Sequence, residues 1–287
     1  MNSADPFPSY RPLLFSIAYR MLGSVMDAED MLQETFLRWQ RAPVEEVENP
    51  RAYLSTVVTR LCIDQLRSAR VQREEYIGPW LPEPLIMNDP APLESTILAE
   101  TLSTAFLVLL ENLNPVERAV YLLREVFDYD YAEIAHITSK TEANCRQLFS
   151  RAKRYITERR PRFDTDPAQE TRLLTQFTQT ILSGDMNGLL ETLAADIVLY
   201  SDGGGVVAAA RSPISSAEKV AHLYLHSFRL VPTDVIFHLA RINGLPGVVG
   251  FYSDGRPYCA MAFHIEGRKI RTIYQVLNPE KLRGIRR

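Results

Sequence analysis

The sequence contains few cysteines and no long apolar run, and both shortages restrict what the chain can be. Cys62, Cys145 and Cys259 lie far apart, with no CxxC motif and no Cys/His cluster. This spacing argues against a disulfide framework and against a structural zinc site. No uninterrupted apolar run approaches the roughly 20 residues that span a bilayer, and the segment MNSADPFPSY has neither a basic start nor an apolar core. We expect a cytoplasmic protein with no metal, no cofactor and no membrane contact.

The net charge is also small, about −3 for 287 residues of which 46% are hydrophobic. Such a composition is typical of a folded chain with two or three domains. Basic residues concentrate between positions 140 and 162, where Glu142 and Glu158 are the only acidic residues. This stretch is a candidate for binding a polyanion, although a solvated helix surface is the commoner origin of a charge run.

Helical periodicity dominates the first 75 residues. Residues 11–22 repeat apolar side chains at helical spacing and stop at Gly23, a common C-terminal helix signal. Asp27 is placed to cap a second helix. Asn49 and Pro50 are typical of an N-cap and a first helical position, and they open a third helix that ends in the basic stretch DQLRSARVQR. These patterns predict an all-α lobe with a basic exit.

A proline-rich segment, GPWLPEPL at residues 78–85, follows this lobe. Proline fixes φ and lacks an amide donor, so the segment must run extended. An ordinary Gly/Ser-rich linker has nothing to bury, whereas this one carries Trp80. Two interpretations follow: a stiff spacer whose tryptophan lies on the nearest domain, or a strap docked on a separate partner.

A second helical lobe begins with a long amphipathic pattern over residues 92–113, followed by Asn114, Pro115 and Glu117, which match a capping box. The stretch DYAEIAHITSKTEANCRQLFSRAKR then predicts a short helix, a polar turn and a longer helix, as in a helix-turn-helix. Any pair of antiparallel helices can show two such apolar stripes, so spacing alone does not establish DNA binding. Side chains able to contact base edges and phosphates point outward from the longer helix: Asn144, Arg146, Gln147, Ser150, Arg151 and Arg154.

The last third of the chain has a different pattern. Helical segments near residues 167–184, 186–194 and 215–228 are accompanied by strand-like runs, which dominate after residue 234 and are separated by turn signals such as SDGR and EGR. This order predicts an α+β domain in which helices pack on one face of a curved antiparallel sheet.

Three motifs, DAEDMLQETFLRW, PRAYLSTVVTRLCIDQLR and YAEIAHITSKTEANCRQLFSRAKR, occur in this order. They resemble the polymerase-binding region, the minus-10 region and the minus-35 helix-turn-helix of a bacterial extracytoplasmic-function sigma factor. WLPEP resembles the sigma-J-like branch of that family, whose members carry a fused SnoaL-like domain. The resemblance implies a multidomain chain with two all-α sigma lobes, the second with the helix-turn-helix, followed by an α+β cone-shaped SnoaL-like domain. The implied domains are sigma region 2 at 7–74, a Pro-rich linker at 75–95, sigma region 4 at 96–162 and the SnoaL-like regulatory domain at 165–287.

The resemblance also implies partners, namely core RNA polymerase and promoter DNA, the latter as minus-35 duplex and minus-10 single strand. The polymerase-binding positions are Asp30, Gln33 and Glu34. The DNA-binding positions are Arg60, Asp64, Arg67 and Arg70 in the minus-10 helix, together with the six outward residues of the helix-turn-helix. Family members often have asparagine at the position of Arg60 and glycine at that of Ser139, where a positive φ would add strain to serine.

SDGGG at 201–205 and NPEKL at 278–282 resemble signatures of the fused domain in that branch. We expect this domain to contact the proline-rich segment and the two lobes, and so to bias the spacing of the lobes. Glycines would allow close backbone approach, and Val206 stands where relatives often have a basic residue. The expected regulatory contacts are Trp80, Leu81, Pro82, Asp202, Gly203, Gly204, Gly205, Asn278, Pro279 and Lys281.

A cone-shaped domain contains a pocket, so an unknown small ligand or a cyclase-like activity has to be considered. Its acid or base candidates are Asp202, His222, His226, His238, His264, Tyr252 and Tyr258. No convergent pair can be assigned among them, and fold analogy does not establish chemistry, so we assign no catalytic residue. The hypotheses, in descending order, are a sigma factor with fused regulation, a polymerase-independent helix-turn-helix regulator that senses a ligand, and a cyclase-like enzyme tethered to a DNA-binding module.

Overall fold

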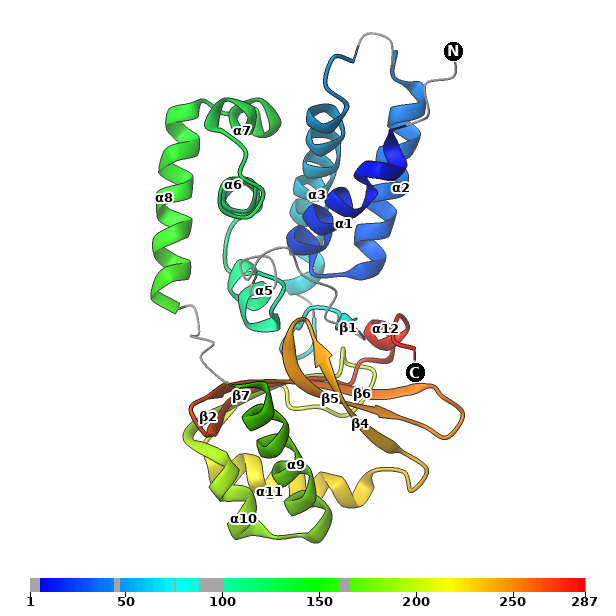
Figure 1. The fold of residues 1–287 in the computed structure, drawn as a ribbon, viewed down its shortest axis with the longest axis vertical. Coiled ribbons are helices and arrows are strands. Elements are labelled where there is room, and N and C mark those ends of the chain that lie inside the picture. Colours follow the sequence, from blue (N-terminus) through cyan, green and yellow to red (C-terminus); the bar gives the residue numbers. More distant parts are fainter. Residues whose placement is uncertain (1–5, 44–46, 75, 88–100, 160–165, 287) are drawn as a thin grey trace. The chain divides into compact units, whose positions relative to one another are not determined.

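Figure 1 shows a computed structural model of the chain, which describes residues 6–43, 47–74, 76–87, 101–159 and 166–286. At residues 69–74 and at Met87 it describes the backbone but not the side chains. The chain forms two compact units. The helical unit comprises Met1–Glu75 and Leu107–Arg160, and the sheet unit comprises Tyr76–Phe106 and Pro161–Arg287.

The helical unit begins with α1 (Phe7–Leu22), α2 (Val25–Arg41) and α3 (Pro50–Glu74), which pack on one another. The predicted end of α1 is confirmed: Gly23 has a φ of 66° and donates its N–H to the carbonyl of Tyr19. The predicted cap of α2 is wrong. Ser24 is the N-cap, and its Oγ accepts the N–H of Asp27 at 3.1 Å. The helix therefore starts at Val25, three residues before the start that an Asp27 cap implies, because serine provides the cap there.

The helix predicted over residues 92–113 is shorter within the part that the structure describes. Residues 101–103 form a turn, and α5 runs from Thr104 to Leu110. The Oγ of buried Ser103 accepts the N–H of Phe106 at 3.2 Å, which caps the helix at this point. The rest of the pattern, residues 92–100, lies outside the described residues.

The second half of the helical unit contains α6 (Pro115–Glu125), α7 (Tyr131–Thr138) and α8 (Glu142–Arg159). The predicted capping box at Asn114 is confirmed, and Asp130 forms a second one with Glu133. Ile134 and Ile137 of α7 share a buried cluster with Cys145 and Leu148 of α8. The predicted helix-turn-helix is thus formed around the apolar side chains that its sequence pattern indicated.

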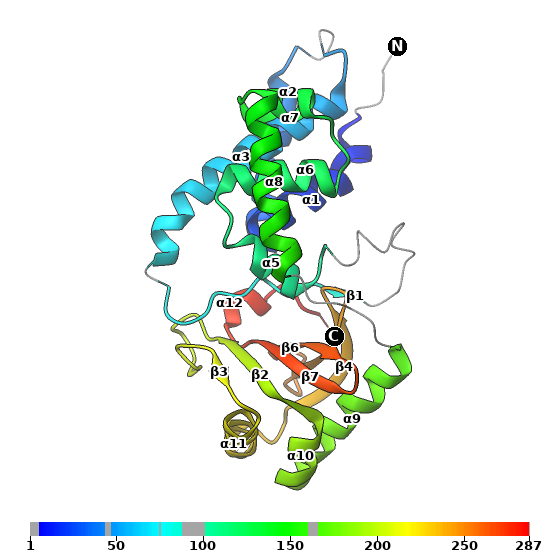
Figure 2. The ribbon, with the colours of Figure 1, turned by 90° about the vertical axis from the view of Figure 1, so that its left-hand side faces the viewer.

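The sheet unit contains α9 (Pro167–Ser183), α10 (Met186–Thr192), α11 (Ala217–Ser227), a 3-10 helix (Phe228–Leu230) and α12 (Pro279–Leu282). Its strands are β1 (Ile86–Met87), β2 (Leu193–Asp202), β3 (Ile214–Ser215), β4 (Ile236–Ile242), β5 (Leu245–Phe251), β6 (Pro257–Glu266) and β7 (Lys269–Val276). They form one sheet in the order β1-β4-β5-β6-β7-β2-β3. Helices α9, α10 and α11 lie along one side of it, which agrees with the predicted α+β class (Figure 2).

The expectation of a wholly antiparallel sheet is wrong at one pair. β4 to β7 form the predicted antiparallel meander, whereas β2 pairs with β7 in parallel, with Tyr200 opposite Tyr274. Alternating hydrophobicity identifies strands but does not encode which distant strand lies beside which. The pairing of β2 with β7 brings the end of β2 next to the end of β7, where the two candidate regulatory motifs begin.

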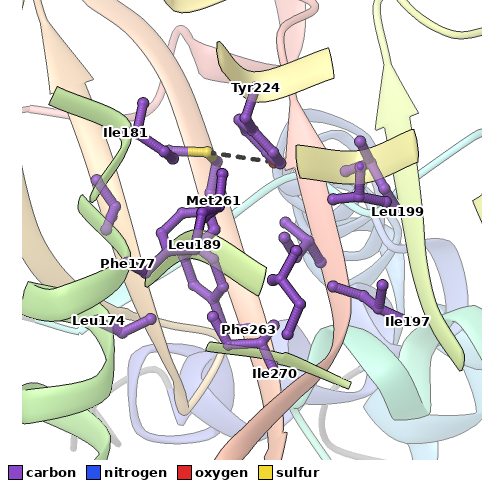
Figure 3. Packing of buried hydrophobic residues seen from close by; sticks show 14 of the residues in the cluster. Leu174, Phe177, Ile181, Leu189, Ile197, Leu199, Tyr224, Met261, Phe263 and Ile270 are labelled. Atoms are coloured by element: carbon purple, nitrogen blue, oxygen red, sulfur yellow. Dashed lines mark hydrogen bonds between the residues drawn. The ribbon is translucent and has the colours of Figure 1, made fainter. Parts of the chain in front are cut away.

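A continuous apolar core joins the helices to the sheet in this unit (Figure 3). Phe177 of α9 packs edge-on against Tyr224 of α11 at 5.5 Å and against Phe263 of β6 at 5.3 Å between ring centroids. The core holds β2 and β7 against the helices and gives the motifs at their ends a rigid base.

Candidate functional site

Asp202 forms the centre of a buried polar cluster at the end of β2. Its side chain is fully buried and accepts four hydrogen bonds. Oδ1 accepts from the hydroxyl of Tyr76 at 2.5 Å and from the N–H of Gly204 at 3.0 Å. Oδ2 accepts from the N–H of Leu81 at 2.8 Å and from Nζ of Lys281 at 2.7 Å. A buried carboxylate is stable only with such a full set of donors, so the cluster requires the segment that supplies two of them.

That segment, residues 76–87, is called the strap below. Leu81 is 1% exposed, and its carbonyl accepts Nζ of Lys281 at 2.6 Å. The same ammonium lies 4.2 Å from the ring centroid of Trp80 and 5.0 Å from that of Tyr76. Cation–π contacts of this kind strengthen when they are shielded from water. Trp80 is half-buried and covers Lys281, which gives the tryptophan of the proline-rich segment a structural purpose.

The glycines of the SDGGG motif allow the strap and α12 to approach closely. Gly204 has a φ of 61°, and a Cβ there would lie 2.2 Å from Nδ2 of Asn278. Asn278 donates from this Nδ2 to the hydroxyl of Tyr76 at 3.1 Å and caps α12 through Oδ1. A Cβ on Gly205 would lie 3.0 Å from Cδ1 of Ile77. The two motifs and the strap therefore form one contact, called the clamp below.

The Tyr76 hydroxyl acts as a donor in the clamp. Burial and the hydrogen bond to Asp202 raise its pKa above the usual value for tyrosine. Tyr76 remains protonated at physiological pH, so its bond to Asp202 does not depend on pH in that range.

The strap is also held at its other end, by residues that the sequence analysis missed. Ile86 of β1 pairs with Ile242 of β4, and the N–H of Asn243 donates to the carbonyl of Leu85 at 2.8 Å. The N–H of Leu85 donates in return to Oδ1 of Asn243 at 3.1 Å. Asn243 has a φ of 51°, as expected for the first residue of an Asn-Gly turn. The sequence therefore indicates the turn at 243–244, but it does not indicate that Asn243 contacts the strap.

The other predicted regulatory residues lie close by. Pro82 is buried within the strap, Gly203 would place a Cβ 2.5 Å from the carbonyl of Val207, and Pro279 begins α12. Val206 is 64% exposed. Direct contacts join Trp80, Leu81, Asp202, Gly204, Asn278 and Lys281, while Pro82, Gly203, Gly205 and Pro279 adjoin them in sequence.

The outward face of α8 is exposed along its length. The predicted DNA-binding residues there are all exposed, while Cys145, Leu148, Ala152 and Ile156 are buried on the opposite side. Arg146 pairs with Glu142 at 2.7 Å, and Arg151 pairs with Glu117 at 3.0 Å. Both arginines are more than half exposed, so such pairs are weak and can exchange for phosphates.

The predicted minus-10 residues of α3 do not form one cluster. Arg60 donates to the carbonyls of Ile137 at 2.9 Å and His136 at 2.8 Å, at the end of α7. Asp64 and Arg67 are exposed and lie 3.4 Å apart. The Arg70 side chain lies outside the described residues. Arg60 is exposed, and its guanidinium lies at the end of α7 because the unpaired carbonyls at a helix C-terminus attract it. Its role at the minus-10 strand stays a prediction.

The outward face of α2 combines charge with exposed apolar side chains. Asp30 and Gln33 are exposed, while Glu34 pairs with Arg38 at 2.8 Å. Met26 and Leu37, at 53% and 37% exposure, lie on the same helical face as Asp30 and Gln33. Apolar side chains exposed beside acidic ones are a feature of surfaces that bind proteins.

The predicted acid or base candidates do not form a catalytic group. His222 and His226 are exposed on α11, His264 is buried, and Asp202 belongs to the clamp. The sheet unit contains a cavity of about 810 Å³, whose described lining includes Tyr252 and Tyr258 but no histidine and no carboxylate. Burial raises the pKa of the lining thiol, Cys259, to about 12. This thiol is therefore not poised to exchange a proton near neutral pH.

Across the described ranges, no cluster of three histidine, cysteine or carboxylate side chains suits a metal ion. Likewise, no described helix combines the length and the apolar character that crossing a membrane requires.

Comparisons with known proteins place these features in a family context. Residues 7–71 match Sigma-70 region 2, and residues 103–156 match Sigma-70, region 4. The chain is 34% identical to the ECF RNA polymerase sigma factor SigJ of Mycobacterium tuberculosis (strain ATCC 25618 / H37Rv), over 97% of this chain and 92% of that protein. It is 31% identical to the probable ECF RNA polymerase sigma factor SigI of the same strain, over 100% and 98%. A crystal structure of the M. tuberculosis extracytoplasmic function sigma factor SigJ is similar with a TM-score of 0.75 and 30% identity, over 96% of each chain.

Proposed function

Because the chain belongs to the extracytoplasmic-function family of RNA polymerase sigma factors, a family of transcription initiation factors, we propose that it binds core RNA polymerase and directs it to specific promoters in the cytoplasm. We further propose that the sheet unit, as a SnoaL-like regulatory domain, controls this activity through the clamp. The observation that supports the second proposal is the buried Asp202 carboxylate, whose donors include Tyr76 and Leu81 of the segment between the two sigma regions.

Docking of the strap changes the length of chain that is free to connect α3 to α5. Residues 75–103 connect these helices, and the strap takes up residues 76–87 of them. Twelve residues of extended chain reach roughly 40 Å, at about 3.3 Å a residue. Docking therefore restricts the distance that sigma regions 2 and 4 can reach from each other. That distance has to match the spacing between the minus-10 and minus-35 elements of the promoter.

The α2 face supports the polymerase-binding part of the proposal. Met26, Asp30, Gln33 and Leu37 form a mixed apolar and polar stripe along one side of the helix. Alternation of apolar anchors with carboxylate and amide groups suits a helical protein partner that carries basic side chains. Glu34, which pairs with Arg38, would lie at the border of this surface.

The α8 face supports the minus-35 part. Asn144, Gln147 and Ser150 provide groups for base edges, and Arg146, Arg151 and Arg154 provide charge for phosphates. Arg60 holds the end of α7 to α3 in this conformation. We expect this contact to break when α3 takes up the unpaired minus-10 strand, which would free Arg60 to join Asp64 and Arg67 at that strand.

Run-off transcription with core polymerase tests the proposal. The arms are the intact chain, the clamp variants Trp80→Ala and Lys281→Met, a deletion from residue 165 onward, and Arg271→Gln as a control. Arg271 is a half-exposed arginine of β7 that pairs with Asp196 and Glu266 outside the clamp. We expect altered promoter output in the first three variants and unchanged output in the control. Unchanged output in all variants would remove the regulatory proposal. Failure of the intact chain to bind polymerase at low salt, with and without the sheet unit, would remove the sigma-factor function itself.

A further inference from the structure

The sheet unit contains a cavity of about 810 Å³ that the hydrogen bonds of Asp202 do not enclose, since Asp202 is absent from its lining. It is lined from several elements, among them Phe177 of α9, Tyr224 of α11, Val248 of β5 and Met261 of β6. Its volume falls within the range of roughly 300–1,000 Å³ that is typical of small-molecule sites, and most of its lining is apolar. A cavity of this kind accepts a molecule with an apolar body.

The charged side chains of the lining are all of one sign. Arg256 and Arg283 line the cavity, with side chains 74% and 65% exposed, whereas no described lining residue is acidic. Arg256 also contacts Asp254 at 2.7 Å, and Arg283 contacts Glu280 at 3.8 Å. Exposed ion pairs of this type are weak and exchange readily with another anion. Two guanidinium groups at the border of an apolar cavity suit a ligand with an anionic end.

The uncharged polar groups lie deeper. Tyr224 is a buried residue, 7% exposed. Its hydroxyl lies 3.4 Å from Oε1 of Gln275 and 3.8 Å from Sδ of Met261, and Figure 3 draws the second contact. Burial raises the pKa of Tyr224 well above the usual tyrosine value, so this hydroxyl stays neutral. The interior therefore accepts an uncharged part of a ligand, and the charge belongs at the border.

Two walls of the cavity are also parts of the clamp. Leu277, Pro279 and Leu282 line the cavity, while Asn278 and Lys281, which alternate with them, hold Tyr76 and Leu81 of the strap. Val207 and Ala208 line it from the loop that follows Gly205, and Gly205 lies against Ile77 of the strap. Opposite sides of the same short segments thus face the cavity and the strap.

We propose that this cavity binds an amphipathic organic acid, an apolar body that ends in a carboxylate or a similar anion, and that its binding stabilises the docked strap. A ligand that packs against α12 and residues 207–208 in their docked positions binds the docked state more tightly than the undocked state. It therefore shifts the equilibrium toward docking, and docking raises its affinity by the same factor. The site itself depends only on the cavity, whereas an effect of the ligand on transcription rests on the function proposed above.

The first experiment measures binding to the full chain by calorimetry, with dodecanoate, dodecanol and dodecylammonium as probes below their micelle concentrations. We expect dodecanoate to bind most tightly and dodecylammonium most weakly. Thr178→Trp fills the cavity from the half-buried side of α9, and Thr175→Trp is its control, one turn earlier and exposed. Thr178→Trp should weaken dodecanoate binding by about tenfold or more, equivalent to at least about 1.4 kcal/mol, while the control leaves it unchanged.

Two results of this experiment would overturn the site. Equal affinity of the Thr178→Trp and Thr175→Trp variants for dodecanoate places binding elsewhere. Dodecylammonium binding as tightly as dodecanoate contradicts the ligand class. The double variant Arg256→Gln with Arg283→Gln checks the same point, since it should bind dodecanoate and dodecanol with similar affinity.

The second experiment follows the strap through iodide quenching of tryptophan fluorescence. Trp39 is 3% exposed, so the quenching reports on Trp80, the other tryptophan of the chain. Dodecanoate should reduce quenching of the intact chain. Lys281→Met should increase quenching and weaken dodecanoate binding by about five-fold or more. The coupling between ligand binding and strap docking would be overturned by one result. In that result dodecanoate binds the intact chain without changing the quenching of Trp80, although Lys281→Met does increase that quenching. Intact coupling with no effect of dodecanoate on run-off transcription would count against the proposed function instead.

Discussion

Asp202 shows how one buried charge can make a linker part of a domain. Its carboxylate is fully buried, and two of its four donors come from the strap, at sequence separations of more than a hundred residues. Loss of any one donor leaves a desolvated charge short of a partner, which costs more than the bond itself contributes. Asp202 therefore contributes strongly to the energetic coupling between the strap and the rest of the sheet unit, beside the contacts of Asn278, Lys281 and Asn243.

We predict that Asp202→Asn lowers the free energy of unfolding of the sheet unit by about 3 kcal/mol, because it leaves the Lys281 ammonium without its buried partner. Urea unfolding followed by circular dichroism measures the change. Asp196→Asn is the control, since Asp196 is 70% exposed and pairs with Arg271 on the surface, where loss of a pair costs less than about 1 kcal/mol. Equal effects of the two substitutions would contradict the central position of Asp202.

Tyr76 predicts a pH dependence at the alkaline end. Its pKa in the folded chain lies above the ordinary tyrosine value of 10.0, so the folded state keeps a proton that the unfolded state loses. The contribution of Tyr76 is therefore fully present below pH 10 and is lost as the pH rises above it. We expect stability to fall less steeply above pH 10 in Tyr76→Phe than in the intact chain, as measured by urea unfolding at several pH values. Other buried tyrosines titrate in both proteins. The test is therefore the difference between the intact chain and Tyr76→Phe in their plots of unfolding free energy against pH.

At the scale of elements, the turn of the helix-turn-helix contains backbone strain. Ser139 has a φ of 54° and a ψ of 44°, the left-handed conformation that glycine adopts without cost. We predict that Ser139→Gly raises the free energy of unfolding of the helical unit by about 1 kcal/mol. Ser150→Gly, in the exposed interior of α8, should lower it by about 0.5–1 kcal/mol, because glycine weakens a helix. Thermal unfolding of the two variants beside the intact chain distinguishes these opposite signs.

A substitution in the glycine loop between β2 and β3 can distinguish the cost of backbone strain from the cost of a steric clash, when it is compared with the same substitution at Gly255. Gly204 and Gly255 both have positive φ, but a Cβ meets Asn278 at the first position and nothing within 4 Å at the second. Gly255→Ala should cost about 1 kcal/mol from strain alone. Gly204→Ala should cost distinctly more and should also increase iodide quenching of Trp80, because Asn278 has to move away from Tyr76. A Gly204→Ala chain with unchanged quenching would show that the close approach is dispensable.

The sequence allowed most elements to be predicted, but few of their long-range contacts. Periodicity and caps located α1, α6, α7 and α8, because each depends on neighbouring residues such as Asn114 and Glu117. The start of α5 and the cap of α2 differed, because Ser103 and Ser24 provide caps that apolar patterns do not reveal. The resemblance of the two motifs pointed to Asp202, Asn278 and Lys281, whereas Tyr76 of the clamp and Asn243 at the other end of the strap belong to no motif. Pairings such as β2 with β7 or Arg60 with α7 depend on tertiary packing and leave no local signature.

At the scale of the whole molecule, charge determines how the chain handles DNA. The net charge is −3, while α8 presents a cluster of arginines, so the isolated chain should bind duplex DNA weakly and only through that helix. We predict a steep decrease of the minus-35 duplex affinity with salt in the presence of core polymerase. Arg151→Gln should reduce the slope of log K against log salt by about 1 if Arg151 makes the proposed phosphate contact. Fluorescence anisotropy at several salt concentrations measures the slope. His222→Gln, an exposed change on α11, is the control and should leave the slope unaltered.

The pairing of β1 with β4 protects the edge of the sheet. While the strap is docked, Ile86 and Met87 cover the outer backbone groups of β4 near Arg241 and Ile242. Release of the strap would leave that strand as an open sheet border with apolar Ile236 and Leu239 exposed beside it. Such an unpaired strand edge can pair with the same edge of another copy of the chain. Prolonged release of the strap therefore favours self-association. We therefore expect the released state of the strap to be short-lived.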